Sequence, residues 1–316
     1  INESHTIYAG QTYAAGGFVY RDAGNGPYTH YVDSSVSCND SNAGGYGTAA
    51  QPRCRIPVTL PEGSVVEIHG SVYDYGNFEG AKMRITGTGT SSKPIFVRGV
   101  STMNRPSLNN REIHVDGAYI ILENLQFYKS KLLFPDRIGS GALHQVASYI
   151  VLRHSKMESD GLPANGSAIS LNGNVSGSGE WSHHHVLYNN EISYYGDWTP
   201  EAENDHLGVT CAQYCEYVWI VDNHIHHLGA DSIRTGTNPA GGITTENTGR
   251  YVYIGRNDMH DNGENAIDIK VSRDIVISQN KMHGFVPSTS SEGAALVSHY
   301  NPQNIWVINN EIYNST

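Results

Sequence analysis

The stretch VWIVDNHI, residues 218–225, sets the pattern that decides the fold. Apolar, largely β-branched residues come first, an Asn follows, and an isoleucine closes the stretch two residues later. Similar stretches recur along the chain: AYIILENLQF (118–127), SYIVLRHSKM (148–157), HVLYNNEI (185–192), VYIGRNDM (252–259), IVISQNKM (275–282) and IWVINNEI (305–312). The closing apolar residue returns at intervals of 23 residues (259 to 282) to 35 residues (157 to 192). A β-rich repeat of this length without helical segments predicts an all-β parallel β-helix, whose stacked coils share one core.

The spacing of turns separates this fold from its main competitor. An antiparallel sandwich would show turn signals every ~8–12 residues rather than one repeat per coil. Four asparagines recur at one turn of the repeat, and we expect a structural role for them, because Asn tolerates unusual backbone angles and can bond to the next coil. They are Asn223, Asn257, Asn280 and Asn310. Residues 1–60 are irregular and rich in Gly, Tyr, Ser and Asn, so we expect an N-terminal cap there and a β-helix domain over 61–316.

Composition agrees with this architecture and excludes some partners. The chain of 316 residues has 34 Gly, 20 Tyr and only 16% charged residues, which favours strands and turns. Its formal net charge of −11 argues against duplex nucleic acid as a partner. An acidic polymer would need a local basic patch, a bound cation, or both. No apolar run is long enough to span a membrane.

The four cysteines form two close pairs, Cys38 with Cys54 and Cys211 with Cys215. An even number in local pairs predicts two short-loop disulfides and an oxidising compartment, and four free thiols are the alternative. The sequence opens at Ile1 without a methionine or a signal peptide, as a processed protein would. We therefore expect a secreted or periplasmic protein, and a monomer.

Charged residues gather in a second strand of the repeat. Three segments can be superposed by their apolar positions: DHLGVT (205–210), DSIRTG (231–236) and NAIDIK (265–270). Strand alternation would send Ile267 and Ile269 inward, and Asp268 and Lys270 outward together. With coils about 4.8 Å apart, this alignment puts Arg234 beside Asp268. It also predicts His206 and Lys270 as flanking residues, with Asp205, Asp231 and Glu264 at the strand entrance. The alternative is a solvated ladder of salt bridges.

The coil pattern, together with GTSSKPIFVRG at residues 89–99, resembles the pectate-lyase-like right-handed parallel β-helix superfamily over roughly residues 60–316. Within it, the arrangement is most similar to polysaccharide lyase families nine and six. In family nine, calcium held by aspartates binds the uronate carboxylate, and a lysine removes the neighbouring proton. The resemblance implies Lys270 as the base, and Asp205, Asp231, Asp268 and Glu264 as calcium ligands. Other lyases of the superfamily use an arginine as base, so Arg234 is a rival.

The chemistry of β-elimination points to the same residue types. The C5 proton of a uronate becomes acidic enough only when its carboxylate is neutralised by a cation or by an arginine. A base must be neutral when it acts, and neighbouring cations favour the neutral form of a lysine. Oxygen ligands suit calcium. We therefore predict a calcium-assisted lyase acting on an acidic polysaccharide, with Lys270, Arg234 and His206 as catalytic residues. The substrate-binding candidates are Tyr194, Tyr195, Trp198, His144 and His299.

Two other functions stay open at this point. A glycoside hydrolase could use Asp231 and Asp268 as acid and base on the same scaffold, and their separation would decide between inversion and retention. A non-catalytic β-helix could bind carbohydrate in adhesion. The histidine-rich segments 183–185 and 224–227 suggest zinc, but such turns are more often solvated or hydrogen-bonded, so we do not expect a zinc site in them.

Overall fold

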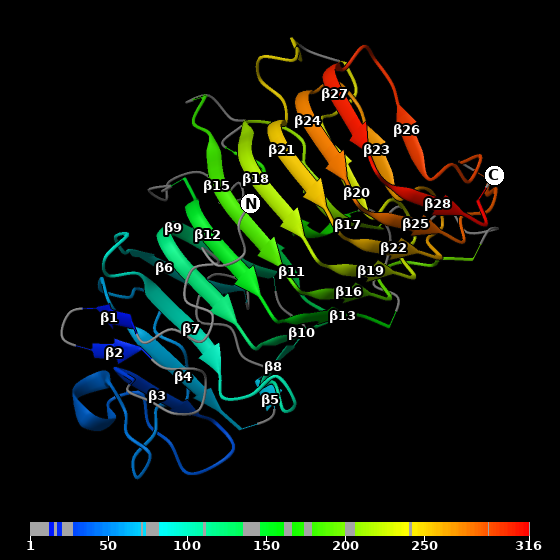
Figure 1. Cartoon of the computed structure of the whole chain (residues 1–316). Coiled ribbons are helices and arrows are strands. Elements are labelled where there is room, and N and C mark those ends of the chain that lie inside the picture. Colours follow the sequence, from blue (N-terminus) through cyan, green and yellow to red (C-terminus); the bar gives the residue numbers. More distant parts are fainter. Residues whose placement is uncertain are drawn as a thin grey trace.

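The computed structural model shows an elongated stack of coils that runs from the N-terminal to the C-terminal part of the chain (Figure 1). It describes residues 13–15, 18–20, 28–70, 72–73, 82–109, 112–134, 146–160, 166–173, 179–199, 206–239, 242–289 and 291–315. Within these ranges, only the backbone is described for 13–15, 18–20 and 72–73. Two predicted site residues, His144 and Asp205, lie outside the described residues.

Each complete coil contributes one strand to each of three parallel sheets. The long sheet contains β3 (His30–Asp33), β4 (Val65–His69), β7 (Ile95–Gly99), the second half of β9 (Glu112–Glu123), β12 (Ser148–Arg153), β15 (Ser182–Tyr188), β18 (Cys215–Val221), β21 (Arg250–Gly255), β24 (Arg273–Ser278) and β27 (Gln303–Ile308). The site sheet contains β6 (Met83–Thr88), the first half of β9, β11 (Lys131–Leu133), β14 (Gly166–Ser170), β17 (His206–Cys211), β20 (Ile233–Thr235), β23 (Ile267–Ile269) and β26 (Leu296–Ser298).

The third sheet, which we call the turn sheet, follows the long strands after a tight turn. It contains β5 (Val72–Tyr73), β8 (Ser107–Asn109), β10 (Gln126–Tyr128), β13 (Lys156–Glu158), β16 (Glu191–Ser193), β19 (His224–His226), β22 (Asp258–His260), β25 (Lys281–His283) and β28 (Glu311–Tyr313). All strand pairs in the three sheets are parallel, which confirms the predicted parallel β-helix. Outside them, β1 (Tyr13–Ala15) and β2 (Phe18–Tyr20) pair antiparallel, and a short 3₁₀ segment, η2, spans Asn42–Gly45.

The closing apolar residues of the repeat stack on one another inside the coils. Ile225 pairs in register with Met259, and Met259 with Met282. All three have 0% exposed surface and belong to one core cluster that also takes in the inward residues of the long and site sheets. A single coil could not enclose such a row, so the stacking of coils is what removes it from water.

The predicted asparagine ladder is present. Asn223 donates from Nδ2 to Oδ1 of Asn257 at 3.0 Å and to the carbonyl of Leu187 at 3.0 Å, and Asn257 repeats this pattern with Asn280 and Ile220. The unusual backbone angle falls one residue earlier than expected, on Asp222 (φ 56°) and its equivalents in neighbouring coils. The asparagines therefore satisfy the buried polar groups of the turn, and the residue before each of them makes the turn.

The N-terminal segment belongs in part to the stack. β3 lies within the region that the sequence assigns to a cap, yet it pairs in parallel with β4. The coils therefore begin before residue 61, and the domain boundary itself stays a prediction. Both predicted disulfides are formed, Cys38–Cys54 and Cys211–Cys215, and the second joins the end of β17 to the start of β18. Among the described residues, no helix is long and apolar enough to cross a membrane.

Candidate active site

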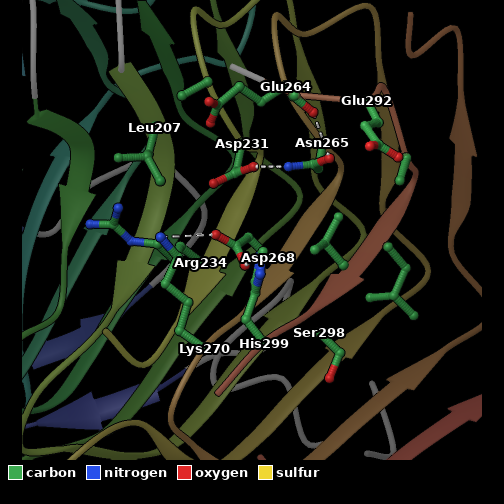
Figure 2. Close-up of a pocket in the computed structure, with 15 residues that line it drawn as sticks. Leu207, Asp231, Arg234, Glu264, Asn265, Asp268, Lys270, Glu292, Ser298 and His299 are labelled. Carbon is green, nitrogen blue, oxygen red and sulfur yellow. Dashed lines mark hydrogen bonds and ion pairs between the residues drawn. The ribbon is translucent and has the colours of Figure 1, made fainter. Parts of the chain in front are cut away.

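A pocket of about 610 Å³ opens on the outer face of the site sheet, over β20, β23 and β26 (Figure 2). Its acidic and basic side chains come from these strands and from the segments just before and after them. The lining residues are Leu207, Ala230, Asp231, Arg234, Glu264, Asn265, Asp268, Lys270, Ser291, Glu292, Ala294, Leu296, Val297, Ser298 and His299. Charged groups are scarce in this chain, so their concentration in one concave site marks it as a functional candidate.

The register of β20 and β23 agrees with the alignment made from the sequence. Arg234 pairs with Asp268, and Ile233 with Ile267. Ile267 and Ile269 are fully buried in the core, so Asp268 and Lys270 face the pocket, as strand alternation predicts. The strand therefore fixes the acid and the amine side by side on a rigid support.

Asp268 lies between two basic groups. Its Oδ2 is 3.4 Å from Nζ of Lys270, and its Oδ1 is 3.1 Å from Nε2 of His299. The backbone N–H of His299 donates to the carbonyl of Ile269, which holds the imidazole on the coil next to Lys270. The Asp268 side chain is only 6% exposed, whereas that of His299 is 42% exposed. A buried carboxylate with an amine on one side and an imidazole on the other can stabilise a positive charge that forms on either.

Two buried polar atoms of this group are left without a directed hydrogen bond. Nε of Arg234 and Oδ1 of Asp268 have no hydrogen-bond partner among the described residues. The 3.1 Å approach of His299 to Oδ1 is thus an ion-pair contact with unfavourable hydrogen-bond angles. Buried polar atoms of folded proteins are normally paired, so an unpaired donor and an unpaired acceptor on two residues that line one pocket make that pocket a candidate site for a polar ligand.

Asp231 contributes a second buried acid at the opposite side of the pocket from Lys270 (Figure 2). Its Oδ1 accepts a hydrogen bond from Nδ2 of Asn265 at 2.8 Å, and Oδ1 of Asn265 in turn accepts one from Ser291 at 3.0 Å. Burial raises the pKa of Asp231 well above its ordinary value, and the charges of Asp268 and Glu264 raise it further. Asp231 therefore keeps its proton to a higher pH in the folded chain than in the unfolded chain.

This rise in the pKa of Asp231 has a consequence for stability. At a pH below the ordinary value of about 3.8, Asp231 is protonated in both the folded and the unfolded chain. Above that pH the unfolded chain loses the proton and the folded chain keeps it, so the free energy of unfolding falls as pH rises. We expect Asp231→Asn, measured in the presence of a chelator, to melt at a higher temperature than the wild type at pH 8. The difference should shrink toward pH 4, and an equal difference at both values would contradict this account.

The predicted position of His206 is wrong. The alignment placed Gly208 beside Arg234 and made His206 a flanking residue, but Thr210 pairs with Arg234 in the structure, which shifts β17 by two residues. His206 pairs with Gly166 instead, is fully buried, and does not line the pocket. Burial, with a smaller effect from Lys131, lowers the pKa of His206 to about 4. It is therefore a neutral residue of the stack away from the pocket.

The predicted aromatic platform also lies elsewhere. Tyr195 has 0% exposed surface and donates its hydroxyl to the carbonyl of Ser130, so it is a core residue. Tyr194 and Trp198 contact each other and His227 after the turn sheet, and neither lines the pocket. Of the predicted substrate-binding residues within the described part of the chain, only His299 lies in the pocket.

Sequence analysis missed Asn265, Ser291 and Glu292, all of which line the pocket. Asn265 could have been found, because the register that pairs Arg234 with Asp268 also places Asn265 next to Asp231. Ser291 and Glu292 lie in an irregular segment before β26 that carries no repeat signal.

The acids of the pocket are suitable donors for a hard cation. Asp231, Glu264 and Asp268 all line it, and one carboxylate oxygen of Asp268 has no hydrogen-bond partner in the described part of the chain. Burial first, and then the charges of Asp268 and Glu264, raise the pKa of Asp231, and a bound cation would oppose this shift. Carboxylate and amide oxygens are the ligands that calcium prefers. The donor chemistry suits calcium, but Asp231, Glu264 and Asp268 do not bring one oxygen each within 4.8 Å of the other two, so all three could coordinate one ion only by moving closer together. Asp205 lies outside the described residues.

Comparisons with known proteins give structural matches only. No protein-family model and no curated protein matches the chain. The GH136 lacto-N-biosidase from Eubacterium ramulus is 16% identical, with a TM-score of 0.48 over 90% of this chain and 51% of the enzyme. Pectate lyase Pel9A is 11% identical, with a TM-score of 0.41 over 89% and 78% of the two chains. A mannuronic acid specific family 6 lyase from human gut microbiota is 12% identical, with a TM-score of 0.31 over 80% and 77%.

The chain thus spans about half the length of the lacto-N-biosidase that it matches. The fold that the predicted resemblance implies, a parallel β-helix, is shown by the strand pairing of this chain itself. At such low identities these likenesses carry no argument about activity.

Proposed function

We propose that this protein is a polysaccharide lyase that cleaves a uronate-containing polymer by β-elimination in the pocket over β20, β23 and β26. The observation that carries the proposal is the group formed by Lys270, Asp268 and Arg234, in which an amine, a buried carboxylate and an unsatisfied guanidinium nitrogen share one cavity. A uronate offers the matching features, which are a carboxylate and an acidic proton on the neighbouring carbon.

Lys270 is the proposed base. In its neutral form the amine would take the C5 proton of the uronate, and the ammonium that results would be stabilised by Asp268 at 3.4 Å. The buried carboxylate would thus do two things: it would orient the base and it would stabilise the base once protonated. His299, on the other side of Asp268 and partly exposed, is placed to contact the substrate.

Arg234 is the proposed partner of the substrate carboxylate. A guanidinium offers several N–H donors in a fixed plane, and the Nε of Arg234 is buried without a partner among the described residues. Neutralising the uronate carboxylate would lower the cost of the carbanion-like transition state at C5. Arg234 stays the alternative base, as in the arginine lyases that the coil pattern resembles.

Calcium is the proposed cofactor. Asp231, Glu264 and Asp268 would hold it, and Asp205 is a further candidate ligand. When bound, calcium supplies a positive charge that neutralises the uronate carboxylate together with Arg234. We also infer an extracellular or periplasmic location, because the two disulfides persist only under oxidising conditions.

The proposal can be tested on the purified chain. Incubation with polygalacturonate, alginate and glycosaminoglycans should yield products with the ultraviolet absorbance of an unsaturated uronate on at least one of these polymers. New reducing ends without that absorbance would indicate hydrolysis instead. Binding to the polymers without any product would indicate a non-catalytic carbohydrate-binding protein.

Removal of calcium gives a separate prediction. We expect treatment with a calcium chelator to lower the rate on a uronate polymer, and added Ca²⁺ to restore it. Because the acids of the pocket repel one another without the ion, Ca²⁺ should also raise the melting temperature of the wild type more than that of Asp268→Asn. Full activity in the presence of the chelator would show that Arg234 neutralises the substrate alone.

A glycoside hydrolase is the second candidate, and the pKa of Asp231 is the observation that favours it. A buried acid whose pKa is raised well above its ordinary value keeps its proton to a higher pH than a free Asp does, and so can act as a general acid. Asp268, held between Lys270 and His299, would be the ionised partner. The same product assay separates this function from elimination.

A further inference from the structure

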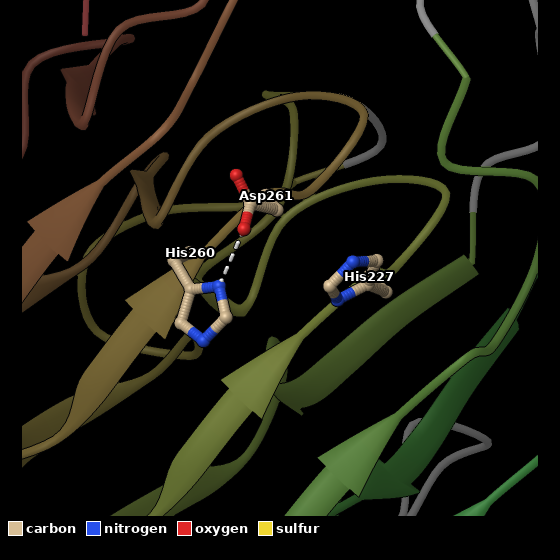
Figure 3. A group of neighbouring side chains, drawn as sticks. All are labelled: His227, His260 and Asp261. Carbon is tan, nitrogen blue, oxygen red and sulfur yellow. Dashed lines mark hydrogen bonds and ion pairs between the residues drawn. The ribbon is translucent and has the colours of Figure 1, made fainter. Parts of the chain in front are cut away.

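A second group of ligand-type side chains lies on a different surface, after the strands of the turn sheet. One ligand atom from each of His227, His260 and Asp261 lies within 4.8 Å of the other two (Figure 3). Within the described ranges, no other three His, Cys, Asp or Glu residues bring one ligand atom each so close together. None of the three lines the pocket of the candidate active site.

The group combines residues from two neighbouring coils. His227 directly follows β19, and Asp261 directly follows β22, which ends with His260. His227 and Asp261 occupy equivalent positions, and both have left-handed backbones, with φ of 54° and 52°. An ion held by all three would therefore connect two coils through backbone positions that are fixed by the turn.

The hydrogen bonds of the two histidines suit metal ligands. Nδ1 of His260 lies 2.8 Å from Oδ2 of Asp261, and its Nε2 lies 2.7 Å from Nε2 of His224. Nδ1 of His227 lies 2.8 Å from Nδ1 of His226, which leaves Nε2 of His227 for an ion. Imidazoles that bind a metal through one nitrogen normally donate the other N–H to a neighbouring acceptor, and here His224 and His226 are those acceptors.

Binding requires no loss of a proton from neutral His260. The proton between Nδ1 and Asp261 would leave Nδ1, and the other tautomer of His260 would carry it on Nε2, where it is donated to His224. Nδ1 of His260 and Oδ2 of Asp261, which lie 2.8 Å apart, can then both bind one ion, with metal–ligand bonds of about 2.0–2.1 Å.

The neighbouring coil leaves room for the carboxylate. Gly284 occupies the position equivalent to Asp261, and a Cβ at Gly284 would lie 2.3 Å from Oδ1 of Asp261. Any side chain there would push the carboxylate out of its place. On the other side, the rings of Tyr194 and Trp198 pack against His227, with ring centroids at 5.1 Å and 5.6 Å. The three ligand residues are thus confined on both sides.

We propose that His227, His260 and Asp261 form a binding site for a divalent transition-metal ion of the zinc class, which ties the coils of β19 and β22 together. Two imidazoles and one carboxylate select zinc-class ions over calcium, because nitrogen ligands suit the softer ion. Three protein ligands leave at least one coordination position for water. The histidine-rich segment 224–227 alone did not indicate this site, since two of its three ligands come from the next coil.

The test is calorimetric titration of the full chain, without a polyhistidine tag, with Zn²⁺ in a buffer that contains excess Ca²⁺. We expect one Zn²⁺ per chain, and an affinity at least about tenfold weaker in His260→Gln and in Asp261→Asn. Cobalt provides a second readout, because Co²⁺ in a site with nitrogen and oxygen ligands has visible absorption bands that should disappear in the same two variants.

Two controls separate this site from other groups. His184→Gln changes a histidine pair with the same 2.8 Å Nδ1–Nδ1 contact, and Asp268→Asn changes the candidate active site. Both should bind Zn²⁺ as the wild type does. The proposal is overturned if the wild type binds no Zn²⁺, if His260→Gln and Asp261→Asn bind it equally well, or if His184→Gln removes it. These experiments measure metal binding and not catalysis, so their outcome does not depend on whether the lyase proposal is correct.

Discussion

Lys270→Ala is expected to lower kcat/KM on a uronate polymer by about 10²–10⁴-fold, the contribution typical of a general base. Alanine removes the amine that takes the C5 proton and leaves Asp268 beside the substrate without its basic neighbour. The assay is initial-rate formation of unsaturated product, with circular dichroism to verify that the coils persist. Since Lys270 is partly exposed at 19% and lies after β23, the substitution should leave the core unchanged.

Lys281→Ala is the matched control for this variant. Lys281 is an exposed lysine of β25 in the turn sheet, away from the pocket. We expect wild-type rates for it. Elimination at wild-type rates by Lys270→Ala would remove Lys270 as the base and leave Arg234 as the remaining candidate.

Arg234→Ala is expected to lower kcat by about 10²–10³-fold, the loss typical when a donor to a developing negative charge is removed. The effect should depend on the charge of the substrate. A methyl-esterified uronate polymer has no carboxylate to neutralise, so the wild type should prefer the free acid and the variant should lose that preference. Arg234→Lys should recover only part of the rate, because an ammonium does not present the planar donors of a guanidinium.

Arg256→Ala serves as the control for Arg234. Arg256 donates to both carboxylate oxygens of Asp222 at 2.8–2.9 Å in the turn after β21 and does not line the pocket. Its loss should affect stability and leave the substrate preference intact. An unchanged preference for the free acid in Arg234→Ala would contradict the proposed role of Arg234.

The fold could be predicted from sequence because its determinants are local and repeated. The apolar positions recur from coil to coil, an asparagine follows the long strands from β15 to β27, and these asparagines bond directly to the next coil. The pairing of Arg234 with Asp268 could be predicted for the same reason, since β20 and β23 begin at equivalent points after their turns.

The position of β17 could not be predicted in this way. A shift of two residues leaves a strictly alternating pattern unchanged, so the sequence pattern did not contradict the wrong register. The alignment matched Leu207 with the inward Ile233, but Val209 pairs with Ile233 and Leu207 lines the pocket. The connection before β17 is also longer than those before β20 and β23, so the repeat does not fix where β17 begins. Tyr195 was predicted to bind substrate, but it is a core residue. Its ring is apolar, and its hydroxyl is satisfied inside the protein by the carbonyl of Ser130.

The metal-type group after the turn sheet shows a further limit of sequence analysis. Runs such as 224–227 attract attention, but adjacent residues of a strand point in opposite directions. The group joins two sequence neighbours at the end of β22, His260 and Asp261, to His227, which occupies the position equivalent to Asp261 in the preceding coil. Comparing equivalent positions of successive coils, in addition to neighbours in sequence, would have found it.

Product analysis after digestion in water labelled with oxygen-18 tests the central claim most directly. Elimination breaks the bond between the sugar and its leaving oxygen without adding water. We therefore predict products that carry an unsaturated uronate at the new non-reducing end and no oxygen-18 from the cleavage step. Incorporation of one labelled oxygen per cleaved bond, with saturated ends, would show hydrolysis and would contradict the account of Lys270, Asp268 and Arg234 given above.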